Sequence, residues 1–211
     1  MRIKVCGMTR PEQVMALDEM EVPFAGFIFY PKSPRYVFKH MSAPDLKKMK
    51  LKKTSKVGVF VNTTVDDILR TVDECGLYIV QLHGDETPRF CEQVSNYVTT
   101  VKAFRLGEND PIEWMIKPYI DVVDMFLFDT EGAGYGGTGK KFNWEVLKGK
   151  YINKPFFLSG GIQPEDTDAL KQFAVSDVAK DLFAIDINSK FEVAPGLKDM
   201  DKVKAFVDQL R

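Results

Sequence analysis

Eight short apolar segments recur along the chain, and amphipathic segments separate them. Each segment is nearly continuous in hydrophobic side chains, and several are rich in β-branched or aromatic residues. The segments are residues 3–7, 24–30, 56–61, 78–82, 98–104, 125–129, 154–160 and 181–186. Such runs are typical of strands that are buried on both faces of a parallel sheet. The pattern therefore predicts eight parallel strands.

The segments between the strands carry helix-start signals or helical spacing. The predicted helices are residues 11–21, 64–75, 86–95, 164–173 and 199–210. Thr63 or Thr64 is the expected N-cap of the second of them. The fifth unit is expected to be irregular, because Pro111 and Pro118 bracket a stretch too short for a regular helix.

Strict alternation of strands and helices predicts a parallel sheet with helical crossovers. Two architectures satisfy it, an open doubly wound sheet and a closed (β/α)8 barrel. Eight strands in 211 residues leave no sequence for another domain, which favours a compact barrel. We therefore expect residues 1–211 to form a single (β/α)8 TIM-barrel catalytic domain.

The charge balance limits the classes of partner. With 29 basic and 30 acidic residues, the formal net charge is −1, which does not favour nucleic acid or an anionic membrane. No segment approaches the roughly 20 apolar residues of a membrane span, and the first ten residues contain no apolar signal region.

The cysteines and histidines limit the compartment and the chemistry. Cys6, Cys75 and Cys91 form an odd, widely spaced set, which indicates reduced thiols and a cytoplasmic protein. Only two histidines are present, so a metal-centred enzyme is not expected. We assign Cys75 and Cys91, with Trp114 and Trp144, to packing.

In a barrel of this kind the reactive groups lie at the carboxyl ends of the strands. Gly160 and Gly161 follow the seventh strand, where glycine lets backbone N–H groups approach an anion closely. Asn188 and Ser189 follow the eighth strand and can add donors. These four residues form a candidate phosphate site, although a Gly-Gly turn is also a common strand–helix connection.

Residues 132–142 form a glycine-rich loop. It satisfies a dinucleotide-binding pattern and nearly satisfies a P-loop, but Lys141 replaces the required Ser or Thr, and no acidic residue ends the next strand. We favour a lid whose glycines Gly136, Gly137 and Gly139 permit closure over a ligand, with a surface loop as the alternative.

Cys6 and Asp129 end strands one and six and are candidates for opposite proton-transfer roles. A thiol can act as a base when its surroundings match its pKa to the task. The end of an apolar strand favours a protonated carboxyl, which a general acid requires. The alternatives are a buried structural thiol and a carboxylate that caps a loop.

Three further polar residues lie at strand ends or in the loops that follow. Arg35, in a turn stiffened by two prolines, suits bidentate binding of a carboxylate or a surface salt bridge. His83 is suited equally to contact with a ligand and to a hydrogen bond within its loop. Asp186 can accept from substrate hydroxyls or orient a loop donor, and the sequence does not separate the two.

These residues lie in motifs that resemble the phosphoribosylanthranilate isomerase family of tryptophan biosynthesis. The resemblance runs in order through nearly the whole chain and includes a PG-KD element near 195–199. Its segments are KVCGMT (4–9), GFIFYPKSPRYV (26–37), VGVFVN (57–62), QLHGDE (81–86), FDT (128–130), GYGGTGKKFNW (134–144), LSGGIQPED (158–166) and AIDINS (184–189).

The resemblance implies a cofactor-free Amadori rearrangement of N-(5-phosphoribosyl)anthranilate on a (β/α)8 barrel. It also implies Cys6 as general base, Asp129 as general acid and Arg35 as the holder of the anthranilate carboxylate. By the same resemblance, Asp186 lies near the sugar hydroxyls. The implied partner is a small phosphosugar, bound by a monomer or homodimer.

One position departs from the family pattern. Lys190 stands where a glycine usually follows the Asn-Ser pair, so the phosphate loop is crowded or gains a positive charge. Two rival functions are the histidine-pathway isomerase on the same barrel, which uses aspartate where this chain has Cys6, and a non-catalytic phosphosugar-binding barrel.

Overall fold

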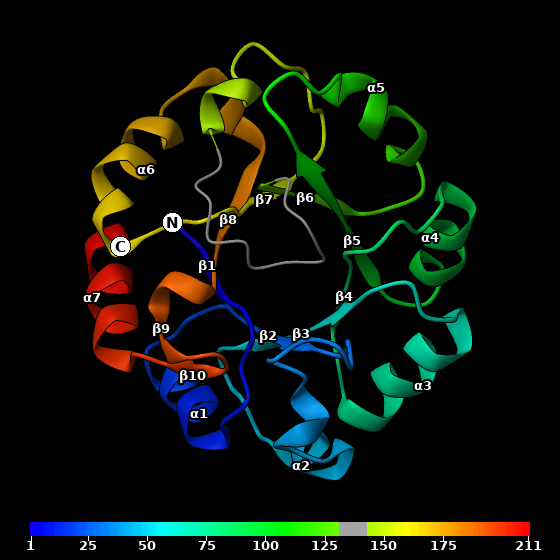
Figure 1. Cartoon of the computed structure of the whole chain (residues 1–211), viewed down its shortest axis with the longest axis vertical. Helices are drawn as coiled ribbons and strands as arrows, with labels where there is room; N and C mark the ends of the chain where they lie inside the picture. Colours follow the sequence, from blue (N-terminus) through cyan, green and yellow to red (C-terminus); the bar gives the residue numbers. More distant parts are fainter. Residues whose placement is uncertain (131–142) are drawn as a thin grey trace.

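The computed structural model describes residues 1–130 and 143–211, and its eight main strands form one closed parallel barrel (Figure 1). The strands pair in sequence order, and β1 pairs with β8 to close the ring. They are β1 (Ile3–Val5), β2 (Phe24–Ile28), β3 (Ser55–Phe60), β4 (Ile79–Leu82), β5 (Thr99–Leu106), β6 (Met125–Thr130), β7 (Phe156–Leu158) and β8 (Leu182–Ile187). The closed barrel confirms the predicted (β/α)8 fold over the open sheet.

The α-helices form a ring outside the barrel (Figure 1). Those described are α1 (Pro11–Glu19), α2 (Ala43–Lys48), α3 (Val65–Cys75), α4 (Pro88–Ser95), α5 (Ile112–Ile116), α6 (Thr167–Ala174) and α7 (Met200–Leu210). Short 3-10 helices occupy Val37–Lys39, Lys117–Tyr119, Trp144–Leu147, Pro164–Asp166, Asp177–Asp181 and Ser189–Phe191. A small antiparallel pair, β9 (Glu192–Ala194) and β10 (Leu197–Lys198), lies between β8 and α7.

Polar side chains fix the start of several helices by accepting from otherwise unpaired backbone N–H groups. Thr64 accepts from the N–H of Asp67, and Thr87 accepts from that of Phe90, so α3 and α4 begin close to the predicted positions. Ser42 and Asp45 form a capping box that starts α2, a helix that the hydrophobic pattern did not predict.

The crossover after β5 departs from a regular helix. After β5 the chain forms only the short α5 and a 3-10 turn, which confirms the irregular fifth unit. After β6 the described residues of the crossover form a 3-10 helix at Trp144–Leu147, and residues 131–142 lie outside the described part of the chain. Trp114 is 75% exposed, which contradicts its assignment to packing, whereas Trp144 is buried as expected.

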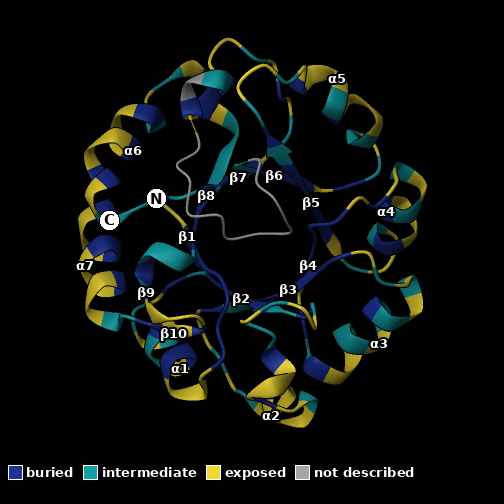
Figure 2. Ribbon diagram, in the orientation of Figure 1, coloured by how far each residue is buried: buried dark blue, intermediate teal, exposed yellow. Residues whose placement is uncertain are grey.

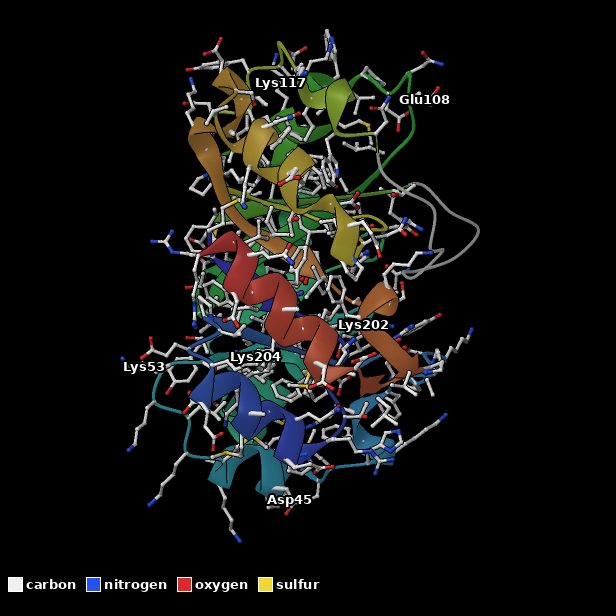
Figure 3. The ribbon with its side chains drawn as sticks, turned by 90° about the vertical axis from the view of Figure 1, so that its left-hand side faces the viewer. Asp45, Lys53, Glu108, Lys117, Lys202 and Lys204 are labelled. Carbon is white, nitrogen blue, oxygen red and sulfur yellow. The ribbon has the colours of Figure 1, made fainter. Side chains whose placement is uncertain are left out.

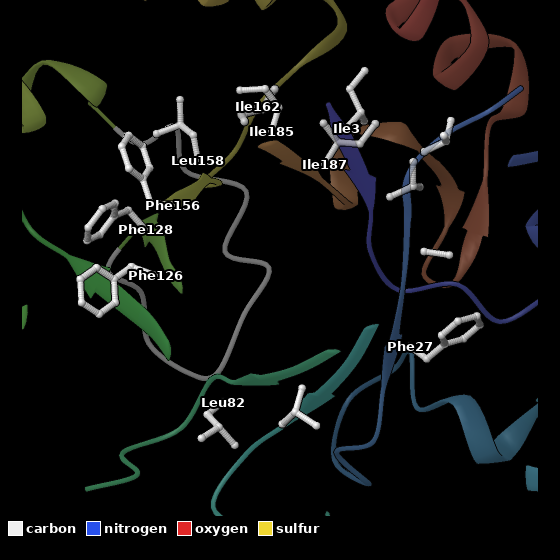
Figure 4. Close-up of a cluster of buried hydrophobic side chains, with 14 of the residues drawn as sticks. Ile3, Phe27, Leu82, Phe126, Phe128, Phe156, Leu158, Ile162, Ile185 and Ile187 are labelled. Carbon is white, nitrogen blue, oxygen red and sulfur yellow. The ribbon is translucent and has the colours of Figure 1, made fainter. Parts of the chain in front are cut away.

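Two apolar layers hold the fold together. The barrel interior is filled by side chains that include Phe24, Val57, Ile79, Leu127 and Phe157. A larger layer lies between the strands and the helices. Figure 4 shows part of it, and its labelled residues include Phe27, Leu82, Phe126, Phe128, Phe156, Ile185 and Ile187. Figure 2 shows the same division, with buried strands inside and exposed outer helix faces.

The outer surface is strongly polar. The charged side chains labelled in Figure 3, Asp45, Lys53, Glu108, Lys117, Lys202 and Lys204, are exposed. Among residues 1–130 and 143–211, no helix has the length and hydropathy that a membrane-spanning segment needs.

Candidate active site

The alternation of side chains along the strands directs a set of polar residues toward the barrel axis. Val5, Leu82, Phe128 and Ile185 pack in the outer layer, so the residue that follows each of them faces inward. The inward residues are Cys6, His83, Asp129 and Asp186. Backbone hydrogen bonds from Cys6 to Ile187 and from His83 to Phe60 extend the ladder past the strand ends and keep this alternation.

Lys4 and Asp186 form a buried ion pair across the seam that closes the barrel. Lys4 is in register with Asp186 on the neighbouring strand, and its Nζ lies 2.9 Å from Asp186 Oδ2. The Lys4 side chain is 1% exposed. Asp186 Oδ1 is also buried and has no hydrogen-bond partner in the described part of the chain. A ligand hydroxyl is a suitable donor for this oxygen, because a buried polar atom without a partner is costly.

Cys6 lies beside this ion pair. A Cβ atom added to Gly26 would lie 2.8 Å from Cys6 Sγ and 3.1 Å from Lys4 Cε, so both side chains pack into the space that this glycine leaves. Burial raises the pKa of the Cys6 thiol, while the positive charges of Lys4 and Lys198 oppose that rise. The free protein therefore favours the protonated thiol, with two cations placed to stabilise a thiolate.

The charges of the Lys4–Asp186 pair influence one another. Burial raises the pKa of Asp186, and Lys4 offsets part of that rise. Burial disfavours the charge on Lys4, but Asp186 and Cys6 outweigh it and raise the pKa of Lys4. The charges of Asp129 and His83 also act on Asp186, which connects the β8 carboxyl electrostatically to the residues of β6 and the β4 loop.

Asp129 lies against His83. The Asp129 Oδ2 atom is 3.4 Å from His83 Nε2, and Asp129 Oδ1 accepts a 2.8 Å hydrogen bond from the backbone N–H of Thr130. Gln81, also on the inner face of β4, places its Nε2 atom 2.8 Å from His83 Nδ1. This contact orients the imidazole, so that its other nitrogen faces the carboxyl.

The predicted phosphate residues lie in the two loops where the sequence placed them. Gly160 and Gly161 have φ angles of 93° and 65°, a backbone conformation that residues with side chains rarely adopt. The 3-10 turn at Pro164–Asp166 and then α6 follow them. In the second loop, Ser189 begins a 3-10 turn, and Lys190 is partly buried without an ion pair in the described part of the chain.

Gly7 brings the Arg35 and Asn188 loops together beside Cys6. Its φ is +75°, and a Cβ atom there would lie 2.7 Å from both Arg35 Cδ and Asn188 Oδ1. The absence of a side chain at Gly7 therefore allows the two loops to meet at the end of β1. The structure thus places the candidate carboxylate-binding residue next to the candidate phosphate-binding loop.

The PG-KD element is hydrogen-bonded to the loop that follows β1 and to α1. The Thr9 hydroxyl donates to the carbonyl of Gly196. Gln13 Nε2 donates to the carbonyl of Lys198 at 2.7 Å, and the N–H of Lys198 donates back to Gln13 Oε1 at 3.0 Å. These bonds hold β9 and β10 over the barrel end and direct the Lys198 side chain inward.

Several residues of the site were not predicted from the sequence. They are Lys4, Gln81, Glu192 and Lys198, each with a buried or nearly buried side chain. A lysine inside an apolar strand is the one signal that could have revealed Lys4. Arg35, which the sequence assigned to a carboxylate or a surface salt bridge, forms a largely buried ion pair with Glu192. Gly136, Gly137 and Gly139, the predicted lid glycines, lie outside the described residues.

No group of three or more His, Cys, Asp or Glu side chains among residues 1–130 and 143–211 is arranged to hold a metal ion. Cys75 and Cys91 are buried in the outer layer, which confirms their assignment to packing.

Comparison with known proteins gives one consistent result. The family model described as N-(5'phosphoribosyl)anthranilate (PRA) isomerase matches residues 3–209. The isomerase of that name from Parabacteroides distasonis is 40% identical over 214 aligned positions, which cover 100% of this chain and 93% of the relative.

Solved structures give the same result. A structure of monomers generated from the dimeric isomerase of Thermotoga maritima is 30% identical, with a TM-score of 0.78 over 99% of this chain and 97% of that one. A phosphoribosyl anthranilate isomerase in complex with reduced 1-(o-carboxyphenylamino)-1-deoxyribulose 5-phosphate is 28% identical, with a TM-score of 0.78 and the same coverage of both chains.

Proposed function

The chain belongs to the phosphoribosylanthranilate isomerase family of tryptophan biosynthesis. We therefore propose that the carboxyl end of its barrel carries out the family's reaction, with Cys6 and Asp129 as the proton-transfer groups. The reaction converts N-(5-phosphoribosyl)anthranilate to 1-(2-carboxyphenylamino)-1-deoxyribulose 5-phosphate. The observation that carries the proposal is the inward placement of a thiol and a carboxyl at the carboxyl ends of β1 and β6 of one barrel.

Asp129 is the proposed general acid. Its proton goes to the furanose ring oxygen as the bond between that oxygen and C1′ breaks, and the anthranilate nitrogen shares its electron pair to give an iminium ion. The carboxylate that remains accepts from the Thr130 N–H and faces His83 Nε2 at 3.4 Å. Both contacts stabilise negative charge on Asp129 as it develops.

Cys6 is the proposed general base. The iminium ion acidifies the C2′ proton, and the small thiolate fraction of Cys6, which Lys4 and Lys198 stabilise, removes it to form an enolamine. Transfer of a proton to C1′ and loss of one from the C2′ hydroxyl then give the ketose. The oxidation at C2′ balances the reduction at C1′ within one molecule, so the step needs no external oxidant or reductant.

Two anionic anchors hold the sugar between these groups. Arg35 is the proposed partner of the anthranilate carboxylate, and the loops of Gly160, Gly161, Asn188 and Ser189 are the proposed phosphate site. Fixing both ends of the substrate makes proton transfer effectively unimolecular. The complex of a 28% identical relative with a reduced product supports a ligand that has both a carboxylate and a phosphate.

Asp186 and His83 are the proposed contacts of the sugar hydroxyls. The buried Asp186 Oδ1 has no hydrogen-bond partner among the described residues, and it faces the barrel interior beside Lys4. A sugar hydroxyl that donates to this oxygen satisfies it. His83 Nε2 is likewise buried, makes no hydrogen bond to a residue of the described part of the chain, and lies 3.4 Å from Asp129 Oδ2.

The pKa of Cys6 leads to a prediction for the free protein. Because burial raises this pKa, we expect Cys6 to stay a neutral thiol at neutral pH and to ionise only above the ordinary thiol value of roughly 8.5. The ultraviolet absorbance of the thiolate, measured as wild type minus Cys6→Ser from pH 6 to 10, should show this. Burial raises the pKa values of Cys75 and Cys91 to about 11 and about 12, so these thiols do not interfere. A full thiolate signal at pH 7 contradicts the prediction.

The function is tested by adding fresh phosphoribosylanthranilate to purified protein and following the loss of anthranilate-type fluorescence. We expect a loss proportional to protein concentration, with the ketose identified by chromatography against a standard. Loss at the spontaneous rate, with free anthranilate as the product, rejects the proposal.

Assembly and location are separate proposals. A relative from Thermotoga maritima is described as dimeric, and for this chain a monomer or a homodimer is proposed. A cytoplasmic location also remains a proposal.

A further inference from the structure

Arg35 presents only part of its guanidinium to a ligand. Its Nε atom lies 2.9 Å from Glu192 Oε1 and 3.0 Å from Oε2, and its Nη2 atom lies 2.6 Å from Oε2. The Arg35 side chain is 12% exposed and that of Glu192 is 4% exposed. In the described part of the chain, Nη1 makes no hydrogen bond. A second carboxylate can therefore form a bidentate pair only with the edge that carries Nη1 and Nη2.

Two further hydrogen bonds hold the Glu192 carboxylate in place. Its Oε1 atom accepts from Lys198 Nζ at 2.8 Å and from the backbone N–H of Gly196 at 3.1 Å. The Lys198 side chain is fully buried, and its Nζ also donates to Asn188 Oδ1 at 2.7 Å. The Glu192 carboxylate, which pairs with Arg35, is thus held in place by Lys198 and Gly196 of the β9–β10 element.

The charges of this group favour an anionic ligand. Arg35 and Lys198 are cations, and among residues 1–130 and 143–211 Glu192 is the only carboxylate that pairs with them, so this group carries an excess of one positive charge. Burial opposes ionisation of Glu192, but Arg35 and Lys198 outweigh it and lower its pKa. Glu192 therefore remains an anion at neutral pH, and its ion pair with Arg35 is maintained.

We infer that Glu192 is a positioning residue that sets the specificity for the aryl carboxylate by aiming the free edge of Arg35 at it. The inference rests on the proposed function, because it needs a substrate whose carboxylate pairs with Arg35. Glu192 does not touch the reacting atoms. It acts by removing the other orientations of a long, flexible side chain, whose ordering otherwise weakens binding.

The test uses Glu192→Gln, which keeps the shape but replaces one acceptor oxygen with a donor. We expect the KM for phosphoribosylanthranilate to rise roughly 10- to 100-fold, the effect of losing hydrogen bonds to a charged group, while kcat changes little. Glu192→Asp should show a smaller rise in KM. Glu12→Gln, a change at an exposed residue of α1, is the matched control and should leave both constants unchanged.

A pair of inhibitors separates positioning from a merely structural role. One is the reduced product with its ring carboxylate, and the other is the same phosphosugar without that carboxylate. Glu192→Gln should weaken binding of the first and leave the second unchanged. Equal losses for both inhibitors, or no loss for either, overturn the inference.

Folding and function are controlled separately. Circular dichroism and thermal unfolding check each variant, and Glu192→Asp carries the same inhibitor test if Glu192→Gln does not fold. If the wild-type protein fails to isomerise phosphoribosylanthranilate, the proposed function is wrong. The inhibitor pair still reports on Glu192, because it measures binding without turnover.

Discussion

Cys6→Ala is expected to remove turnover of phosphoribosylanthranilate while the reduced product analogue still binds. The substitution deletes the one inward-facing thiol that lies beside Lys4, and alanine cannot accept the C2′ proton. A general base is typically worth about 10²–10⁴ in rate, so kcat should fall by a factor in that range. The fluorescence assay gives kcat, and calorimetric titration with the analogue gives the affinity.

Cys75→Ala is the matched control for this result. Cys75 is a buried thiol at the end of α3, in the layer between strands and helices, and the proposed reaction does not use it. We expect it to lower thermal stability somewhat and to leave kcat unchanged. A Cys6→Ala protein with wild-type kcat would show that the thiol is a packing residue and would reject the mechanism.

Asp129→Asn is expected to reduce kcat by about 10²–10⁴, the usual contribution of a general acid. Asparagine has the size of aspartate, and its carbonyl oxygen can still accept from the Thr130 N–H. It cannot supply an acidic proton to the ring oxygen. Because the change preserves shape, the affinity for the reduced product analogue should stay within a few-fold of the wild-type value, as measured by titration.

Asp121→Asn serves as the control for this substitution, because Asp121 is exposed in the turn just before β6. It should have wild-type kinetics. If Asp129→Asn is as active as Asp121→Asn, the general acid is another group, and His83, at 3.4 Å from Asp129, becomes the first candidate to test.

The hydrophobic pattern was enough to predict the barrel. Strand segments such as 125–129 are apolar at every position because both faces are buried, one inside the barrel and one under the helices. Local signals also placed helix starts, since Thr64 and Thr87 cap nearby N–H groups in the same stretch of chain. The pattern did not predict α2, whose start is fixed by the capping box of Ser42 and Asp45.

The candidate site was predictable only in part. The rule that barrel sites lie at the carboxyl ends of strands selected Cys6, Asp129 and Asp186 from the sequence. The same rule assigned no role to Gln81, which lies two residues before His83 on the inner face of β4. A glutamine in a strand gives no sign of its partner until the neighbouring strands are in place.

The sequence by itself determined the strand segments, the order of the motifs and the residue types available for acid–base chemistry. Only the tertiary structure decided which charges meet. Lys4 pairs with Asp186 because closure of the barrel sets β1 in register with β8, and Arg35 pairs with Glu192 because the β9–β10 element folds back onto the first loop. Such partners are separated by more than 150 positions in the chain, and buried charges are stable only when they are paired. The pattern of hydrophobic and polar residues within one segment therefore does not predict which of these charged residues form pairs.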